Sequence, residues 1–320
     1  MSSLQLEPVD SVDVTIVVDN FVDVLMAGEQ DVRRYPLPVH FFHGEHLIAE
    51  HGYSTLITVR LEGSSSRILY DAGLSKDGLA HNLDVLQTNA LDLRAIVISH
   101  GHADHHGGLE RLLRRHGPPH LPLVIHPAAW RERRIVLPTG NEVLLPAPSK
   151  ADLEAEGIQV VEEAGPTLIV DGTILVSGQV ERTTEFETGF PVHQARTEGG
   201  TWEPDPLILD DQNVVVNVRD LGLVVVSACS HSGAVNVVRN ARRLTGIDPI
   251  GGFVGGFHLT GGLFEPIIGP TVSAFIEMGV RRLVPGHCTG WRAVHELARR
   301  LPDAFVQTSV GTTLHFQSMA

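Results

Sequence analysis

The chain lacks the features that a small secreted protein or a membrane protein needs. It has only two cysteines in 320 residues, too few for a framework of disulfides. No apolar run approaches the roughly 18 residues that span a bilayer. The N-terminus, MSSLQLEPVD, has neither the basic start nor the apolar core of a signal peptide. We therefore expect a cytoplasmic protein without membrane association.

Positive charge is also scarce. The chain has 24 Lys and Arg against 38 Asp and Glu, a formal net charge of −14, which disfavours binding to nucleic acid. By contrast it has 18 histidines, and imidazole is a common metal ligand. We expect a small-molecule substrate as the partner, and the oligomeric state is left open.

Short β-branched runs followed by helical patterns recur along the chain. Strands come first in each half and helices follow, which predicts an α/β protein with two sheets packed face to face and helices outside. A polar, irregular stretch separates the halves and is typical of a lid. We expect one domain over 1–320, with halves at about 1–178 and 213–320 and a lid-like insertion at about 179–212. The expected strands are 12–18, 54–61, 67–70, 95–99, 213–218, 221–228, 250–257 and 282–284.

The strongest chemical signal is the string SHGHADHHGG at residues 99–108, between an apolar strand and an amphipathic helix. His100 and His102 alternate at the strand end and can face one ion. The following turn brings Asp104 and His105 round to a second ion beside it. Loop histidines seldom combine this spacing with this context, so the string predicts a metal site.

This motif resembles the hallmark His-x-His-x-Asp-His of the metallo-β-lactamase superfamily, and the resemblance spans nearly the whole chain. It implies a four-layer αβ/βα sandwich made of two mixed sheets. Within the superfamily, the chain is most similar to the branch that resembles the archaeal dihydropterin ribofuranosyl-aminobenzene phosphate synthase. The matching strings are at 18–20, 51–54, 69–73, 229–231, 256–259 and 287–290.

Other candidate residues also follow predicted strands. His231 and His287 emerge where sheets of this class place their sites, and we expect both to bind metal. His258 also ends a strand; the resemblance implies either a general acid that assists the leaving group or a supporting role. Asp71 is expected to orient a ligand histidine.

The chain departs from the superfamily pattern at two ligands. The superfamily normally supplies a third histidine to the first metal and an aspartate that bridges both metals. The string LDDQ at 209–212 stands where the third histidine would fall, and Cys229 stands near the aspartate position. His231, Asp210 or Asp211 could replace the missing imidazole. Cys229 could bridge as a thiolate, although a small buried residue is the preferred interpretation.

Together these residues predict a hydrolase with two divalent metal ions, zinc by preference, with iron or manganese as alternatives. A metal-bound hydroxide would attack the substrate, and Asp104 would bind one ion and orient the hydroxide. Arg182 in the lid could hold a phosphate or carboxylate, although a solvated surface arginine is the preferred interpretation. We expect a phosphoester or cyclic phosphodiester of a small molecule. The alternatives are a carbon ester, as in lactonases or thioesterases, and a metal-stabilised protein that binds a pterin-like ligand without turnover.

Overall fold

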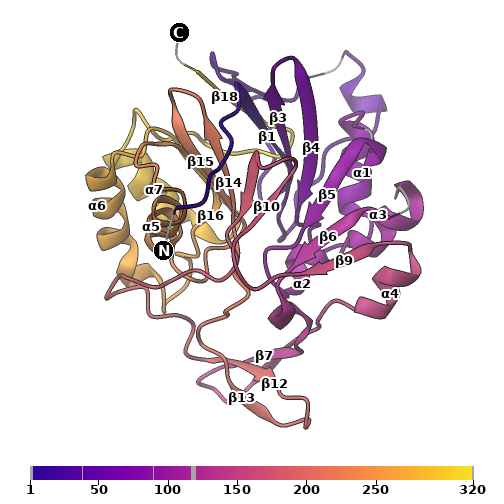
Figure 1. Ribbon diagram of the computed structural model, residues 1–320, viewed down its shortest axis with the longest axis vertical. Coiled ribbons are helices and arrows are strands. Elements are labelled where there is room, and N and C mark those ends of the chain that lie inside the picture. The colour runs from indigo at the N-terminus through magenta and orange to yellow at the C-terminus, as the bar shows by residue number, and fades with distance from the viewer. Residues whose placement is uncertain (1–2, 38, 89, 117–119, 319–320) are drawn as a thin grey trace.

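Most strands of the two large sheets are buried on both faces. In β15 (Gly222–Ser227), Val224 and Val226 pack between the sheets, whereas Leu223 and Val225 pack against helices. A strand covered on both sides is a continuous apolar run, which explains why several strands could be predicted from the sequence. The resulting layers are helix, sheet, sheet and helix (Figure 1).

The structure is a computed structural model that describes residues 3–37, 39–88, 90–116 and 120–318. The first sheet is mixed and has the order β2-β18-β1-β3-β4-β5-β6-β9. Its strands are β1 (Ser11–Val18), β2 (Val32–Arg33), β3 (Ser54–Leu61), β4 (Ser64–Tyr70), β5 (Leu93–Val97), β6 (Pro122–Ile125), β9 (Gln159–Glu162) and β18 (Thr313–Gln317).

The second sheet has the order β10-β11-β14-β15-β16-β17, with β15, β16 and β17 parallel. Its strands are β10 (Thr167–Ile169), β11 (Ile174–Val176), β14 (Val214–Val218), β15, β16 (Ile250–Gly256) and β17 (Leu283–Gly286). The predicted halves do not map one to one onto the sheets, because β18 joins the first sheet and β10 and β11 join the second.

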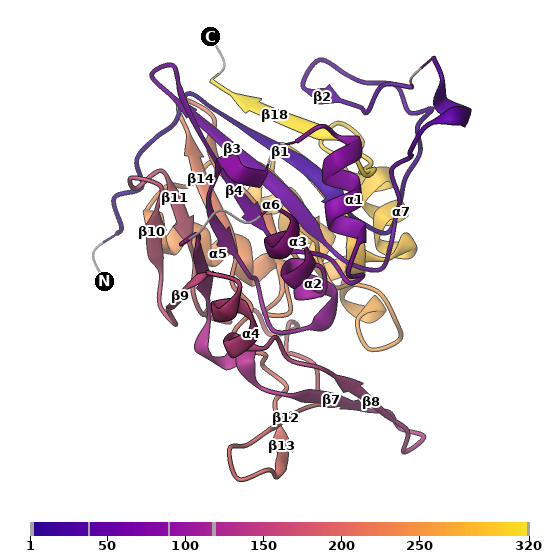
Figure 2. The ribbon, with the colours of Figure 1, turned by 90° about the vertical axis from the view of Figure 1, so that its right-hand side faces the viewer.

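Helices cover the outer face of each sheet. α1, α3 and α4 lie on the first sheet, and α5, α6 and α7 lie on the second (Figures 1 and 2). No helix in the described part of the chain is long and apolar enough to cross a membrane. The α-helices are α1 (Gly78–Val85), α2 (Ala103–His106), α3 (Leu109–His116), α4 (Lys150–Ala155), α5 (Ala234–Thr245), α6 (Ile268–Met278) and α7 (Trp291–Arg300). The 3₁₀ turns are η1 (Phe41–His43), η2 (Ala90–Asp92), η3 (Pro127–Trp130), η4 (Glu265–Ile267) and η5 (His287–Thr289).

A third, smaller sheet projects from one end of the sandwich (Figures 1 and 2). We call it the lid sheet; its order is β13-β12-β7-β8. The stretch 179–212, predicted to be irregular, contains two of its strands, and the other two come from a segment about 60 residues earlier. The strands are β7 (Arg133–Val136), β8 (Glu142–Leu145), β12 (His193–Arg196) and β13 (Trp202–Pro204).

The predicted fold class, a four-layer sandwich of two mixed sheets with outer helices, is confirmed. The predicted strand at 54–61 matches β3 residue for residue, and the other expected strands differ from the observed ones mainly at their ends. The sequence reasoning missed the lid sheet and several strands of the first sheet. Among these is β18, whose partners β1 and β2 lie near the opposite end of the chain.

Candidate metal centre

The histidine-rich motif lies at the carboxyl end of β5. The chain passes through His100 and His102, both buried, before α2 begins. A Cβ added to Gly101, between the two histidines, would lie 2.1 Å from the carbonyl oxygen of Ala129. Only glycine therefore lets the backbone pass this close and keeps both rings on the same side.

The second sheet supplies further candidates at the same edge. Cys229 and His231 follow β15, His258 follows β16 and His287 follows β17. The carboxyl ends of parallel strands form the edge at which open α/β sheets place their sites. Ser230, His258 and His287 have φ angles of 55°, 45° and 46°, in the left-handed region that non-glycine residues seldom adopt. Backbone strain of this kind concentrates at functional sites.

Three histidines form one candidate ligand group, which we call the imidazole site: His100, His102 and His231. Nε2 of His100 lies 3.0 Å from Nδ1 of His102 and 3.1 Å from Nε2 of His231. Nitrogen ligands of a tetrahedral zinc ion lie about 3.3 Å apart, given bonds of about 2.0 to 2.1 Å. These separations fit a shared cation after a small adjustment.

A second group, the carboxylate site, consists of Asp104, His105 and His287. Oδ2 of Asp104 lies 3.4 Å from Nε2 of His105 and 3.3 Å from Nε2 of His287. Both Nε2 atoms are buried without a hydrogen-bond partner. Buried polar atoms are normally paired, and these two are instead directed at the same carboxylate oxygen. The spacing fits a second cation.

Contacts on the opposite ring nitrogens orient two of these histidines. Nδ1 of His100 lies 2.8 Å from Oγ of Ser99, and Nδ1 of His105 lies 2.7 Å from Oδ2 of Asp71. The expected contact between Asp71 and a candidate ligand is therefore present. Asp71 also accepts hydrogen bonds from the backbone N and from Oγ of Ser99, each at 2.7 Å. Such partners fix the tautomer and leave Nε2 to face an ion.

The histidines of the imidazole site are held neutral. Burial lowers the pKa of His100, His102 and His231 well below the usual histidine value, and neighbouring rings that would carry the same charge lower it further. Neutral imidazole offers a free electron pair, which is the form that binds a metal.

The carboxylate site has the opposite electrostatics. Burial raises the pKa of Asp104, but His105 and His287 outweigh that effect and hold it well below its ordinary value. Burial likewise lowers the pKa of His105, but the negative charges of Asp104 and Asp71 outweigh burial and raise it well above its ordinary value. Negative charge here therefore attracts a cation, and without one it retains protons on the rings.

The sequence reasoning gave no role to two histidines at this centre. One is His51, whose Nε2 lies 3.7 Å from Oδ2 of Asp104. The other is His193 in β12 of the lid sheet. Its side chain is fully buried, and its Nε2 lies 2.9 Å from Nε2 of His102. Its Nδ1 lies 2.9 Å from the carbonyl oxygen of Asp205. Strand β12 reaches the centre only because it pairs with β7, so no local spacing pointed to this residue.

Asp210 and Asp211, predicted as alternative ligands, face other partners. Asp210 accepts hydrogen bonds from Arg133 at 2.5 Å and from the backbone N of Gly101 at 2.8 Å. Asp211 accepts hydrogen bonds from the backbone N and Oγ of Ser232 at 2.9 and 2.5 Å. These contacts fix the loops that carry the motif and His231, and the suggestion that one of the two aspartates replaces a histidine stays a prediction.

Arg182 was a candidate for holding a substrate anion. Instead, its Nη2 donates hydrogen bonds to the carbonyl oxygens of Leu207 at 2.6 Å and His231 at 3.1 Å. Arg182 is absent from the described residues that line the cavity over the two sites. Its geometry supports a positioning role for the loop of His231, because the guanidinium is engaged with backbone.

Both sites lie on the floor of a cavity of about 450 Å³, a volume typical of small-molecule sites. The lid sheet and the loops next to it form an apolar wall opposite the histidines. The wall contains Ile135, Leu144, Leu145, Pro146 and Phe190; the floor contains His102, Asp104, Cys229, His231, His258 and His287, and His51 lies at the side.

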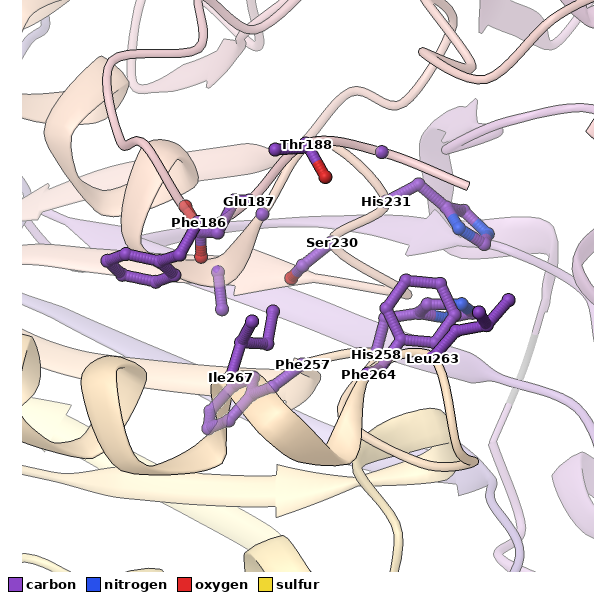
Figure 3. A pocket seen from close by; sticks show the side chains of 13 residues that line it. Phe186, Glu187, Thr188, Ser230, His231, Phe257, His258, Leu263, Phe264 and Ile267 are labelled. Carbon is purple, nitrogen blue, oxygen red and sulfur yellow. The ribbon is translucent and has the colours of Figure 1, made fainter. Parts of the chain in front are cut away.

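A smaller cavity of about 40 Å³ adjoins the centre, with His231 and His258 at one end and Phe186 and Glu187 at the other (Figure 3). The centroids of the two imidazole rings are 4.2 Å apart. The volume suffices for ordered water, which needs roughly 10 to 15 Å³ per molecule on this measure. His231 and His258 thus line both cavities.

A four-layer sandwich with histidine and carboxylate groups gathered at one sheet edge defines a metal-binding protein of the hydrolase type. The chain belongs to the metallo-beta-lactamase superfamily, whose family model matches residues 47–287. Members of this superfamily generally bind divalent metals, and the clusters of histidine, cysteine and aspartate found here could hold them.

Proteins similar to this chain occur in Methanocaldococcus jannaschii. One is a 7,8-dihydropterin-6-methyl-4-(beta-D-ribofuranosyl)-aminobenzene-5'-phosphate synthase, 29% identical over 84% of this chain and 90% of its own length. Another, an uncharacterized protein, is 30% identical over 82% of this chain and 92% of its own. A solved structure, Tm1679, a metal-dependent hydrolase of the beta-lactamase superfamily, is similar in fold. Its TM-score is 0.72 and its identity 24%, covering 96% of this chain and 99% of that one.

Proposed function

We propose that the protein is a hydrolase that uses two divalent metal ions, zinc by preference, to cleave a phosphoester or cyclic phosphodiester of a small molecule. The observation that supports this most is the pair of adjacent ligand groups on the floor of one cavity. Two such ions, when bound, lower the pKa of a water molecule toward neutrality and polarise a phosphoryl or carbonyl oxygen.

Asp104 and His258 have the positions to handle protons in this reaction. In addition to its role in the carboxylate site, the Asp104 carboxylate can accept a hydrogen bond from the attacking water and so orient it. Nδ1 of His258 lies 3.3 Å from Sγ of Cys229, which leaves Nε2 to donate a proton to the leaving group. The ring of Phe264, at a centroid distance of 4.4 Å, supports the His258 ring.

The apolar wall and the named relative favour a substrate with a flat ring and a phosphate. Phe190 stands beside His258, with ring centroids 5.8 Å apart, and can pack on an aromatic ring of the substrate. The name of the relative contains a dihydropterin and a phosphate. A pterin-like or nucleotide-like phosphoester would place its ring on this wall and its phosphate over the floor.

One observation favours a carbon ester as the second candidate. Within the described part of the chain, the residues that line the cavity include no lysine or arginine, so no fixed positive side chain meets a phosphate there. Ile135, Leu144 and Leu145 would suit an acyl chain. Lactones and thioesters are therefore the substrates to set against phosphodiesters.

The test compares metal-loaded and chelator-treated protein on bis(p-nitrophenyl) phosphate, p-nitrophenyl phosphate, p-nitrophenyl acetate and a lactone, with metal content measured on the same samples. We expect metal-dependent turnover of a phosphoester that His100→Ala abolishes. His295→Ala, which changes an exposed histidine on α7, is the matched control and should retain it. Turnover of the carbon esters alone would favour the second candidate. Metal-loaded protein that turns over none of them would contradict the proposal.

A further inference from the structure

Cys229 lies between the two candidate metal sites. Its Sγ and the ring nitrogens of His100 and His231 lie within 4.8 Å of one another. The same sulfur and the ring nitrogens of His105 and His287 also lie within 4.8 Å of one another. Among the described groups that could hold a metal, Cys229 is the member that joins residues of the imidazole site to residues of the carboxylate site.

The surroundings of this side chain differ from those of a cysteine that only fills space. Cys229 is 3% exposed, yet it lines the cavity and has polar neighbours. Its Sγ donates a hydrogen bond to Sγ of Cys288 at 3.0 Å and lies 3.3 Å from Nδ1 of His258. Because its Sγ is the donor in the hydrogen bond to Cys288, the group carries a proton when no cation is bound. A bound divalent cation displaces that proton, because a coordinating thiol is deprotonated.

We propose that Cys229 supplies a thiolate that is shared by the two metal ions. The inference rests on the proposed function, since it requires that the centre binds metal. A thiolate has several lone pairs and can contact two cations at once, with zinc–sulfur bonds of about 2.3 Å. The sulfur then brings negative charge to the imidazole site, which has no carboxylate of its own.

Cys288 holds the shared sulfur in place. It follows His287 directly, and its Sγ lies 3.4 Å from the carbonyl oxygen of Cys229 as well as near the Cys229 sulfur. A Cβ added to Gly256 would lie 2.7 Å from Sγ of Cys288, so this sulfur is packed against β16. When Cys229 binds metal as a thiolate, the Cys288 thiol can donate a hydrogen bond to the Cys229 sulfur, 3.0 Å away.

A shared thiolate also narrows the choice of metal. Imidazole and carboxylate ligands alone suit zinc, iron and manganese alike, whereas a thiolate favours zinc and its analogue cobalt(II) over manganese and magnesium. We therefore expect zinc to displace manganese from the reduced protein, and a tenfold excess of manganese not to reverse this.

Cobalt(II) gives the direct test, because a thiolate bound to it adds a charge-transfer band in the near ultraviolet. The full chain, reduced with a phosphine and stripped of metal, is titrated with cobalt while the spectrum and the bound cobalt are recorded. We expect the band to grow through both equivalents, because both ions contact the sulfur. It should persist in Cys288→Ser and disappear in Cys229→Ser. Cys229 and Cys288 are the only two cysteines in the chain. If Cys229→Ser does not fold, a band that remains in Cys288→Ser still identifies Cys229 as the ligand, because no other cysteine is left.

Three outcomes would overturn the inference. Two bound cobalt ions without a charge-transfer band would show that no cysteine is a ligand. A band that is complete after the first equivalent would show that the sulfur belongs to one ion. A band that is lost in Cys288→Ser and kept in Cys229→Ser would show that Cys288, and not Cys229, binds the cobalt. Failure of the proposed function looks different: the protein would bind no cobalt or would turn over no substrate.

Discussion

The imidazole site and the carboxylate site share one cavity floor, but the pKa values of their histidines are shifted in opposite directions. The first presents three rings whose pKa values are lowered by burial, so they are neutral and unprotonated. The second contains a buried carboxylate that raises the pKa of the adjacent His105 and keeps a proton on its ring. We therefore expect the imidazole site to favour metals that accept nitrogen lone pairs and the carboxylate site to attract positive charge in general.

The largest effect should follow removal of the negative charge of the carboxylate site. In Asp104→Asn, His105 and His287 lose the anion that faces them, and we expect one metal ion per chain to be lost. Hydrolysis should fall by about 10³-fold or more, because activation of the water depends on both ions. Elemental analysis and turnover on the same samples measure the two effects.

The control is Asp248→Asn, which alters an aspartate whose side chain is 89% exposed. It should bind as much metal as the wild type. An Asp104→Asn protein that keeps two ions per chain and its full rate would remove the distinction between the two sites.

The next prediction concerns Asp71 and Ser99, whose side chains contact Nδ1 of His105 and His100. Asp71→Asn removes the charge beside Nδ1 of His105 and should weaken metal binding at the carboxylate site by roughly 10- to 100-fold. Ser99→Ala removes the contact to Nδ1 of His100, and it should act directly on the imidazole site and on the carboxylate site only through the lost hydrogen bond to Asp71. Competition with a chromophoric chelator resolves the two affinities. Equal weakening of both ions in both variants would mean that the sites behave as one unit. Thermal unfolding checks that Asp71→Asn, which alters a fully buried group, remains folded.

The sequence predicts those parts of the centre whose geometry is local. His100, His102, Asp104 and His105 lie within six positions, so one strand end and one short helix bring them together. Strands such as β15 were predictable because burial on both faces leaves an unbroken apolar run over residues 223–226. The family resemblance extended this local reading to His231 and His287.

The remainder of the centre depends on contacts between distant segments. His193 comes close to His102 only through the pairing of β12 with β7, and nothing within a few residues of it indicates this. Asp210 has a residue type suited to metal binding, but the buried Arg133, 77 positions away, takes its carboxylate. Residue type and spacing cannot decide between a cation and an arginine as the partner of an aspartate.

His193 tests whether the lid sheet takes part in the imidazole site. In His193→Ala the contact between its Nε2 and Nε2 of His102 is lost. We expect metal affinity at the imidazole site to fall by roughly 10-fold, with the carboxylate site nearly unchanged. Calorimetric titration with zinc separates the two binding events. The comparison variant is His106→Ala, which changes a histidine of the same motif whose Nε2 contacts the carbonyl oxygen of Pro146. It should leave zinc binding at the imidazole site unchanged. Unaltered zinc binding in His193→Ala would restrict this histidine to a structural role.

The smallest effect concerns a carboxylate that already has its positive partners, in contrast to Asp104. Asp13 in β1 lies 2.8 Å from Nη2 of Arg60 and 2.5 Å from Nδ1 of His315. Burial raises its pKa, but Arg60 and His315 outweigh burial and the net pKa is lowered below 3.8. An acid whose pKa is depressed by folding stabilises the protein above its unfolded pKa, and this stability is lost as the pH falls through the folded pKa.

Asp13→Asn should therefore lower the free energy of unfolding at pH 7 by roughly 1 kcal/mol or less, because Arg60 is partly exposed to solvent. The difference between variant and wild type should shrink below about pH 4, where the wild-type carboxylate takes up its proton. Urea unfolding of the metal-free protein from pH 3 to 7 measures this, and metal binding should not change. In the described part of the chain the ion-pair partners of Asp104 are histidines, whereas Asp13 also has an arginine. If Asp13→Asn altered metal affinity, pairing within the chain would no longer distinguish Asp13 from Asp104.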